Sequence, residues 1–351
     1  MQQATKTPPA KPSTTTDGFG PSNVREELVL EVKDLRTEIR TREGVLRPVN
    51  GVSFSVKPGQ VLGLVGESGA GKTMTAFSIL DLVPYPAKVV GGEVLFQGRD
   101  LRKLKNEELR RIRGSEIACV FQDANMGLNP VLTVGIQMEE VITTHLKIPK
   151  SEARAMAEDV LGRVGLPDPK TVMTRYTFQL SGGMCQRVMI AMALVLTPKV
   201  LIADEPTTGL DVTLQADILQ QLRMLKEKLG TAIILISHDL GVTAQMADEV
   251  AVMYGGHIVE RTDAVSLFRK PMHPYTYGLM RSIPKLNHPD ARLVSLAGAP
   301  PDLRTVGDGC PFLPRCNKAV NACRLEPMPP LKELERGHWV ACYNHVRHDW
   351  D

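Results

Sequence analysis

The sequence contains no long apolar run and no excess of one charge. No stretch within its 351 residues approaches the roughly 20 consecutive apolar side chains that a spanning helix needs. The opening residues, MQQATKTPPAKPSTTTDG, lack the apolar core of a signal peptide. The 42 basic and 39 acidic residues leave a formal charge of only +3, too even for a nucleic-acid footprint. We expect a cytosolic chain that binds no nucleic acid and meets a membrane only through another protein.

Internal repeats at periods of roughly 20 to 50 residues are also absent, which argues against a tandem pair of similar units. Residues 1–27 are rich in Pro, Thr, Lys and Ser, and we predict a disordered tail there. Frequent prolines after about residue 264 interrupt any long element, so residues 265–351 are predicted to form a separate, loop-rich C-terminal domain. That leaves residues 28–264 as the main folded unit.

The main unit has the pattern of an α/β domain. From Lys72 onward, helical and strand-like segments alternate, which predicts a largely parallel central sheet. The clearest helix follows Thr213 and ends before Gly230. The runs at 200–204 and 232–237 are short and continuously apolar, which predicts strands buried on both faces. The predicted strands are 28–32, 52–56, 61–65, 200–204 and 232–237.

A glycine-rich segment of the form G-x-x-x-x-G-K-[ST] follows the strand at 61–65 and precedes a helical run. Backbone N–H groups of such a loop and the helix N-terminus bind phosphate. Lys72 is predicted to contact the β- and γ-phosphates of ATP, and Thr73 to bind Mg²⁺. The alternative is an ordinary Gly-rich turn that joins a strand to a helix. Packing alone would not explain the presence of Lys72-Thr73 in such a turn. The predicted loop residues are Gly66, Glu67, Ser68, Gly69, Ala70, Gly71, Lys72 and Thr73.

Two carboxylates end the apolar strand at 200–204 and its next residue. Asp204 is predicted to hold the Mg²⁺ shell, and Glu205 to polarise the attacking water as general base. The alternative is an exposed acidic pair with no role beyond solubility.

Leu180-Ser181-Gly182-Gly183-Met184 resembles the signature motif of the ABC ATPases, whose usual form ends in Gln where this chain has Met184. Gln122, which follows the strand IACV, resembles the family's Q-loop residue. Thr208-Gly209-Leu210-Asp211 resembles its D-loop, and His238 its switch histidine. Taken alone, the SGG segment could simply cap a helix.

The resemblance implies a P-loop NTPase fold of the ABC cassette type, with a RecA-like core, an N-terminal antiparallel β subdomain and an α-helical subdomain at about 130–178. It implies that Ser181, Gly182 and Gly183 face the γ-phosphate of ATP held by a second subunit. Gln122 would sense Mg²⁺ and His238 would contact the γ-phosphate. Ile39 stands where many relatives stack adenine on an aromatic ring.

The resemblance narrows to the ATPase subunits of oligopeptide and dipeptide (peptide/nickel) importers and covers about residues 28–345. It implies a peripheral ATPase at the cytoplasmic face of the membrane, with a second homologous ATPase, two transmembrane permease subunits and an extracytoplasmic peptide-binding protein. Nickel chelates or antimicrobial peptides are alternative cargoes. A soluble ABC ATPase and a non-hydrolysing cassette are the alternative classes. The specific marks are Gly66-Glu67-Ser68-Gly69, Phe121-Gln122-Asp123, Ala203-Asp204-Glu205-Pro206, His273-Pro274-Tyr275-Thr276, Gly309-Cys310-Pro311-Phe312 and Pro314-Arg315-Cys316.

Four of the six cysteines lie after residue 309, with the spacing C-x5-C-x6-C-x18-C, which matches neither common zinc sites nor ferredoxins. The resemblance implies a 4Fe-4S cluster at these four positions. Zinc and unligated thiols are the alternatives. The four residues are Cys310, Cys316, Cys323 and Cys342.

Overall fold

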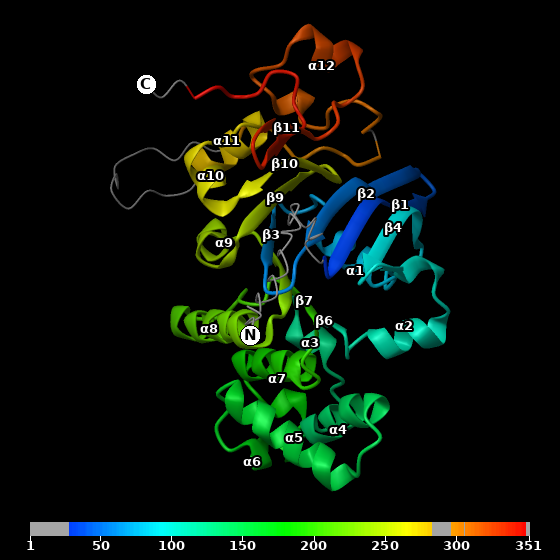
Figure 1. The fold of residues 1–351 in the computed structure, drawn as a ribbon, viewed down its shortest axis with the longest axis vertical. Coiled ribbons are helices and arrows are strands. Elements are labelled where there is room, and N and C mark those ends of the chain that lie inside the picture. The colour runs from blue at the N-terminus through cyan, green and yellow to red at the C-terminus, as the bar shows by residue number, and fades with distance from the viewer. Residues whose placement is uncertain (1–27, 283–295, 305, 349–351) are drawn as a thin grey trace, which may run out of the picture.

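The computed structural model describes residues 28–282, 296–304 and 306–348, so the predicted tail at 1–27 lies outside the described residues. Its strands form two sheets (Figure 1). The smaller sheet is antiparallel, with the order β2-β1-β4-β5. Its strands are β1 (Leu30–Thr41), β2 (Gly44–Val56), β4 (Ala87–Phe96) and β5 (Arg99–Asp100).

The larger sheet has the order β11-β12-β10-β9-β3-β8-β7-β6. Neighbouring strands from β9 to β6 pair in parallel, whereas β10, β11 and β12 pair antiparallel. The runs predicted at 200–204 and 232–237 are strands β7 and β8 with the same bounds. The strands are β3 (Val61–Val65), β6 (Ile117–Val120), β7 (Val200–Asp204), β8 (Ala232–Ser237), β9 (Glu249–Tyr254), β10 (His257–Asp263), β11 (Lys332–Glu335) and β12 (His338–Val340).

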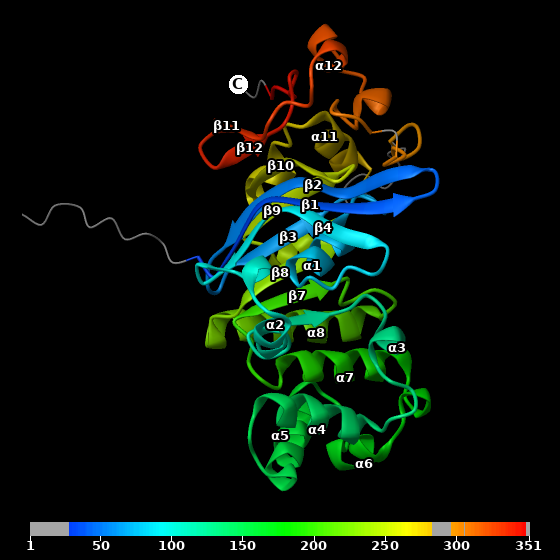
Figure 2. The ribbon, with the colours of Figure 1, turned by 90° about the vertical axis from the view of Figure 1, so that its right-hand side faces the viewer.

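The central strands are buried on both faces, as their continuous apolar runs predict. Leu201 and Ala203 of β7 pack into a core shared with the helices on one side. Val200 and Ile202 point the other way, into a core shared with the antiparallel sheet. Because side chains alternate along a strand, a strand covered on both faces must be apolar at every position. Figure 2 shows the antiparallel sheet lying over the central strands.

Helices complete the main unit, and each connects strand ends or covers the sheet. The predicted helix after Thr213 is α8, and Gly230 ends it in the left-handed conformation at φ 66°. The helices of this part are α1 (Lys72–Ile79), α2 (Asn106–Ile112), α3 (Ala124–Gly127), α7 (Gly182–Leu194), α8 (Val212–Leu229) and α9 (Leu240–Met246), with the short 3-10 turn η1 (Leu101–Lys103).

A helical region extends from the sheet below α7 in the views of Figures 1 and 2. Its apolar residues join the core that also covers the sheet, including Met138, Ala157 and Val172. Within the described part of the chain, no helix combines the length and apolar character needed to cross a bilayer. The elements are α4 (Val134–His145), α5 (Lys150–Arg163), α6 (Pro169–Thr174) and η2 (Thr177–Gln179).

The C-terminal segment extends the larger sheet. Strand β12 pairs with β10 through Glu260↔Val340 and Arg261↔Trp339. The Glu260 side chain is fully buried and accepts hydrogen bonds from the backbone N–H groups of Met272 and His273. His338 contacts the same carboxylate at 2.6 Å. The helices here are α10 (Ala264–Arg269), α11 (Pro274–Arg281), η3 (Leu313–Arg315) and α12 (Asn321–Leu325).

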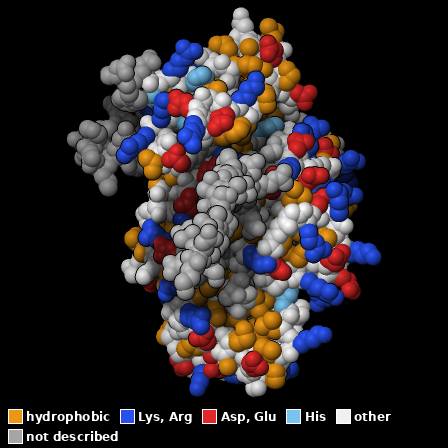
Figure 3. Space-filling model, viewed as in Figure 1, with side chains coloured by type: hydrophobic (Ala, Val, Ile, Leu, Met, Phe, Trp, Pro, Cys, Tyr) orange, Lys and Arg blue, Asp and Glu red, His pale blue; other side chains and the backbone are white. Residues whose placement is uncertain are grey.

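Basic and acidic side chains are interspersed over the face seen in Figure 3. The domain division at residues 264/265 stays a prediction, as do the bounds of the helical subdomain.

Candidate functional site

The glycine-rich loop connects β3 to α1 and is shaped by two close backbone contacts. Gly66 has φ 153°, and a Cβ there would lie 2.3 Å from the Met253 carbonyl oxygen. Gly71 has φ 105°, and a Cβ there would lie 1.9 Å from the Pro48 carbonyl oxygen. Gly69 also has positive φ, at 79°, but its Cβ would meet nothing within 4 Å. Only glycine fits the first two positions without moving the backbone.

The Lys72 side chain folds back over this loop. Its Nζ donates to the Gly66 carbonyl at 2.8 Å and to the Glu67 carbonyl at 3.1 Å. The residue is only 7% exposed. Burial lowers the pKa of Lys72, although the nearby charges of Glu205, Asp204 and Glu67 act to raise it. The ammonium therefore lies within the field of the two predicted strand-end carboxylates.

Helix α1 begins without a side-chain cap, because its N-cap is Gly71. The first N–H groups of a helix have no partner inside the helix and carry partial positive charge. Together with the N–H groups of the loop, they form the geometry in which helices bind phosphate.

Asp204 lies at the end of β7 and is 1% exposed. Burial raises its pKa, while a hydrogen bond with Thr73 and the charge of Lys72 act in the opposite direction. Among the described residues, its Oδ1 atom is a buried acceptor with no hydrogen-bond partner. An unpaired buried carboxylate oxygen is costly, and a hard cation would satisfy it.

Glu205 is the residue after Asp204, and its carboxylate contacts three side chains that lie at separate places in the sequence. Gln122 Nε2 donates to its Oε2 at 2.8 Å and the Thr208 hydroxyl donates to the same oxygen at 3.0 Å. His238 Nδ1 lies 3.0 Å from Oε1. Burial acts to raise the pKa of Glu205, but the hydrogen bonds from His238 and Thr208 outweigh it, so the pKa is lowered. Glu205 itself has the unusual φ of 48°.

These contacts bring together Lys72, Asp204, Glu205, Gln122 and His238, which the sequence predicted from four separate motifs. The strands that lead to these residues lie side by side in the sheet, in the order β3-β8-β7-β6. Parallel strands present their carboxyl ends at one edge, where α/β proteins bind their ligands. The sheet order thus explains the assembly of the site.

The signature segment lies at the start of α7 and faces outward. Ser181 is exposed, and its hydroxyl caps the helix by accepting from the Met184 N–H at 3.3 Å. Gly182 is exposed too, whereas a Cβ on Gly183 would lie 2.9 Å from the side chain of Leu214. Asp211 similarly caps α8, accepting from the Leu214 N–H at 3.0 Å. In the described residues, neither cap residue has a hydrogen bond to Lys72 or Glu205.

Two contacts of the site were missed by sequence reasoning. Arg315 forms a bidentate ion pair with the Glu67 carboxylate, at 2.7 and 3.1 Å. The Tyr275 hydroxyl accepts from the Glu67 N–H at 2.8 Å. Pro314-Arg315-Cys316 and His273-Pro274-Tyr275-Thr276 had stood out in the sequence only as marks of resemblance. No local pattern could connect them with the loop.

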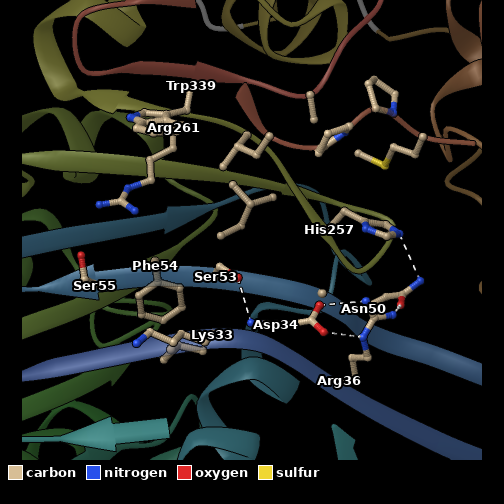
Figure 4. Close-up of a pocket in the computed structure, with 18 of the residues that line it drawn as sticks. Lys33, Asp34, Arg36, Asn50, Ser53, Phe54, Ser55, His257, Arg261 and Trp339 are labelled. Atoms are coloured by element: carbon tan, nitrogen blue, oxygen red, sulfur yellow. Dashed lines mark hydrogen bonds and ion pairs between the residues drawn. The ribbon is translucent and has the colours of Figure 1, made fainter. Parts of the chain in front are cut away.

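A separate hollow lies between the antiparallel sheet and the C-terminal segment (Figure 4). On one wall Arg36 pairs with Asp34 and donates to Asn50, whose amide contacts His257 at 3.2 Å. Burial lowers the pKa of His257 to about 4, so its ring is neutral near pH 7. Trp339 lies at the far end. The described residues that line this hollow include none of the predicted ATP-site residues.

The predicted 4Fe-4S cluster is wrong. In the described residues, which include all four cysteines, no group of three or more His, Cys, Asp or Glu side chains is arranged to hold a metal ion. The cysteines do line one small apolar cavity with Phe312. Burial raises the pKa of Cys310, Cys316 and Cys342, the last to about 12. Metals bind the thiolate, so this apolar surrounding disfavours the ligand form.

Comparison with known protein families gives two matches. Residues 49–208 match the family model described as ABC transporter. Residues 259–323 match the model described as the C-terminal region of oligopeptide/dipeptide transporters. Neither description names an iron–sulfur cluster.

Curated relatives match over nearly the whole chain. A probable peptide ABC transporter ATP-binding protein of Sinorhizobium fredii is 47% identical over 92% of this chain and 96% of its own length. The dipeptide transport ATP-binding protein of Bacillus subtilis is 46% identical, over 90% of this chain and 95% of its own. The oligopeptide transport ATP-binding protein of Salmonella typhimurium is 43% identical, over 95% and 97%.

Solved structures match the fold. A dimeric ATP-binding cassette in a post-hydrolysis state with ADP and phosphate has a TM-score of 0.62 and 27% identity, covering 67% of this chain and 98% of its own. The structure of cbiO1 from Clostridium perfringens, part of the ABC transporter complex cbiONQ, has a TM-score of 0.58 and 28% identity, covering 70% of this chain and 92% of its own. The α/β cassette architecture expected from the sequence is therefore confirmed.

Proposed function

The chain belongs to the family of ABC transporter ATP-binding proteins, and we propose that it hydrolyses ATP to power the import of peptides. The peptide cargo is supported by relatives named peptide, dipeptide and oligopeptide transport proteins, and by the match of residues 259–323. The observation that carries the hydrolytic part is the Glu205 carboxylate, which gathers Gln122 and His238 beside buried Lys72.

Lys72 is the proposed phosphate-binding cation. Its ammonium exchanges the Gly66 and Glu67 carbonyls for the β- and γ-phosphate oxygens of ATP. Charged oxygens make the stronger hydrogen bonds, so the exchange favours binding. The loop from Gly66 to Thr73, with Ser68 and Ala70 between, supplies N–H groups to the same phosphates.

Thr73, Asp204 and Gln122 are the residues proposed to hold Mg²⁺. The buried Asp204 Oδ1 without a partner and the hydrogen bond between Thr73 and Asp204 support this assignment. When bound, the ion would neutralise charge on the β- and γ-phosphates.

Glu205 is the proposed general base. Its lowered pKa keeps the carboxylate ionised at neutral pH, ready to accept a proton from the attacking water. Gln122 and Thr208 fix the orientation of the carboxylate through Oε2. His238 holds Oε1 and is proposed to contact the γ-phosphate once ATP separates the pair.

The partners are proposed from the exposed signature face. Ser181, Gly182 and Gly183 are placed to complete the ATP site of a second homologous ATPase, with Asp211 near the same interface. Two transmembrane permease subunits would hold the pair at the cytoplasmic face of the membrane, through the region at about 130–178. An extracytoplasmic peptide-binding protein would deliver the cargo.

The test is peptide uptake and ATP turnover by the assembled complex in proteoliposomes. Lys72→Met keeps the side-chain length but removes the charge, and we expect both activities to be lost together, by about 10²- to 10³-fold in turnover. Lys228→Met is the matched control, because Lys228 is exposed on α8. Full peptide uptake by the Lys72→Met complex would refute the proposal.

A further inference from the structure

The second residue of the phosphate loop is held by the C-terminal segment. The Glu67 carboxylate and the Arg315 guanidinium form two parallel contacts, at 2.7 and 3.1 Å, across 248 positions of sequence. The Arg315 side chain is 5% exposed and that of Glu67 is 24% exposed. Bidentate Arg–carboxylate pairs fix geometry as well as charge, and water screens a covered pair weakly.

Arg315 cannot follow Glu67 if the loop moves, because its guanidinium also donates hydrogen bonds to other residues. Its Nε donates to the Ala297 carbonyl at 2.9 Å, and its Nη1 also donates to the Tyr254 hydroxyl at 3.1 Å. The guanidinium carbon lies 5.7 Å from the centre of the Tyr254 ring and 6.0 Å from that of Phe312. The cation is therefore a fixed anchor for the loop.

The Glu67 backbone is held as well. Its N–H donates to the hydroxyl of Tyr275, a fully buried residue, at 2.8 Å. The Tyr275 ring packs on Tyr254 and Phe312, with centroids 4.4 and 5.5 Å away. The Glu67 carbonyl accepts a hydrogen bond from Lys72 Nζ. Backbone donor, backbone acceptor and carboxylate of this one residue are thus all engaged.

The charge of Glu67 also bears on the ligand. Its carboxylate lies close enough to influence the Lys72 ammonium, the group proposed to bind triphosphate. A free carboxylate at that position would repel a polyanion, and the repulsion is strong where water is partly excluded. Arg315 compensates this charge while it holds the loop in place.

We propose that Arg315 and Tyr275 are positioning residues for ATP binding, so that the C-terminal segment is a clamp on the phosphate loop. This inference rests on the proposed function. It assigns the segment a task in the nucleotide cycle in addition to any contact with partner subunits. Opening of the clamp would weaken ATP binding, and bound ATP would in turn stabilise the docked C-terminal segment.

The experiment measures MgATP affinity of the full-length chain by calorimetry, with circular dichroism as the check on folding. Arg315→Met removes the cation and exposes the triphosphate to the Glu67 charge, so we expect the Kd to rise by about 5- to 150-fold. In the double variant Glu67→Gln/Arg315→Met the repulsion is gone but the loop is still not held by Arg315, so the Kd should return only part of the way to wild type. Arg324→Met, on exposed α12, is the matched control and should leave Kd unchanged.

Two further variants test the proposal even if Arg315→Met folds poorly. Arg315→Lys retains the positive charge and should keep most of the affinity. Tyr275→Phe removes only the acceptor of the Glu67 N–H and should raise the Kd less than Arg315→Met does. In the assembled complex, these changes should raise KM and leave kcat nearly constant, because the repulsion acts on bound substrate and transition state alike.

A purely structural role predicts lower melting temperatures with unchanged Kd, and that result would overturn the proposal. Equal Kd values for wild type, Arg315→Met and the double variant would also overturn it. A wild-type chain that fails to bind MgATP would instead refute the proposed function, and this inference with it.

Discussion

Glu205 and Glu67, whose charges both act on Lys72, are held by partners that differ in charge. Glu205 is bound by Gln122, Thr208 and His238, of which none carries a permanent positive charge. Glu67 is bound by the guanidinium of Arg315, which is always charged and covered from water. A carboxylate proposed to accept a proton needs neutral hydrogen-bond partners, which can let go of it during the reaction. A carboxylate beside a triphosphate needs a permanent positive charge to compensate its own.

The origin of these partners differs in the same way. Those of Glu205 come from the ends of neighbouring parallel strands or the turn that follows, so the sheet itself assembles them. Those of Glu67 come from the C-terminal segment, which also adds β12 and β11 to one edge of the larger sheet. The contacts of Glu205 are thus built into the sheet, whereas those of Glu67 depend on the C-terminal segment.

The sharpest test of this comparison is the same substitution at both glutamates. In the assembled complex, Glu205→Gln should lower ATP turnover by about 10²- to 10⁴-fold, because the general base is removed. Glu67→Gln should lower it by less than about tenfold, since its carboxylate has a positioning task only. Steady-state turnover at saturating MgATP measures both. Equal losses would break the distinction between the two glutamates.

The glycine-rich loop that carries Glu67 should tolerate changes of backbone conformation poorly. Gly71→Ala combines φ 105° with a Cβ 1.9 Å from the Pro48 carbonyl, so we expect it to lower the free energy of unfolding by about 2–4 kcal/mol. Gly69→Ala is the matched control, because its φ of 79° costs about 1–2 kcal/mol but its Cβ meets open space. Urea denaturation measures both. A larger loss at Gly69 would contradict this account.

His238 tests whether the partners of Glu205 act in turnover. His238→Gln removes a ring nitrogen 3.0 Å from Glu205 and the proposed γ-phosphate contact, and should lower kcat by about 10²-fold with little change in MgATP affinity. His345→Gln, in the C-terminal segment, is the control for loss of an imidazole. A His238→Gln complex with normal kcat would leave His238 without its proposed role.

Sequence reasoning bounded the strands next to Glu205 correctly, and for a physical reason. Strands buried on both faces need an unbroken apolar run, so β7 and β8 could be bounded to the residue, and Asp204 and Glu205 followed from the strand end. Exposed strands give no such signal. Strand β11 is exposed along its whole length, and the outer half of β1 carries Glu38, Arg40 and Thr41. The sequence did not predict β11, and it placed β1 only at 28–32.

The contact between Arg315 and Glu67 could not be predicted from local sequence patterns. Arg315 and Glu67 are 248 positions apart, and neither has a neighbour in sequence that indicates the other. The four cysteines show the opposite error. The resemblance implied a cluster ligand set, and the four residues do line one cavity, but the described residues form no metal site there, and burial raises the thiol pKa of Cys310, Cys316 and Cys342. Proximity alone does not define ligand geometry.

The smallest expected effect concerns Asp204, the neighbour of Glu205 with the opposite pKa shift. Burial raises the pKa of Asp204, so its stabilising contribution is fully present below its unfolded value near 3.8 and is lost as pH rises through the raised folded value. The lowered pKa of Glu205 stabilises the fold above about 4.5, and that contribution is lost as pH falls through the folded value. Asp204→Asn should therefore raise the free energy of unfolding at pH 7 by about 0.5–2 kcal/mol in the absence of nucleotide and Mg²⁺.

The gain should shrink as pH is lowered toward the unfolded pKa of Asp204, because the wild-type carboxyl is then neutral as well. Thermal unfolding between pH 7 and pH 4 measures this, with Asp159→Asn as the control, because the carboxylate of Asp159 on α5 is exposed and its partner Arg163 is exposed too. Added MgATP should reverse the order, stabilising wild type more than Asp204→Asn, since ligand that binds only the native state adds to its stability. A variant that is less stable than wild type without nucleotide would mean that Asp204 is satisfied inside the fold, and its unpaired oxygen would no longer indicate a cation site.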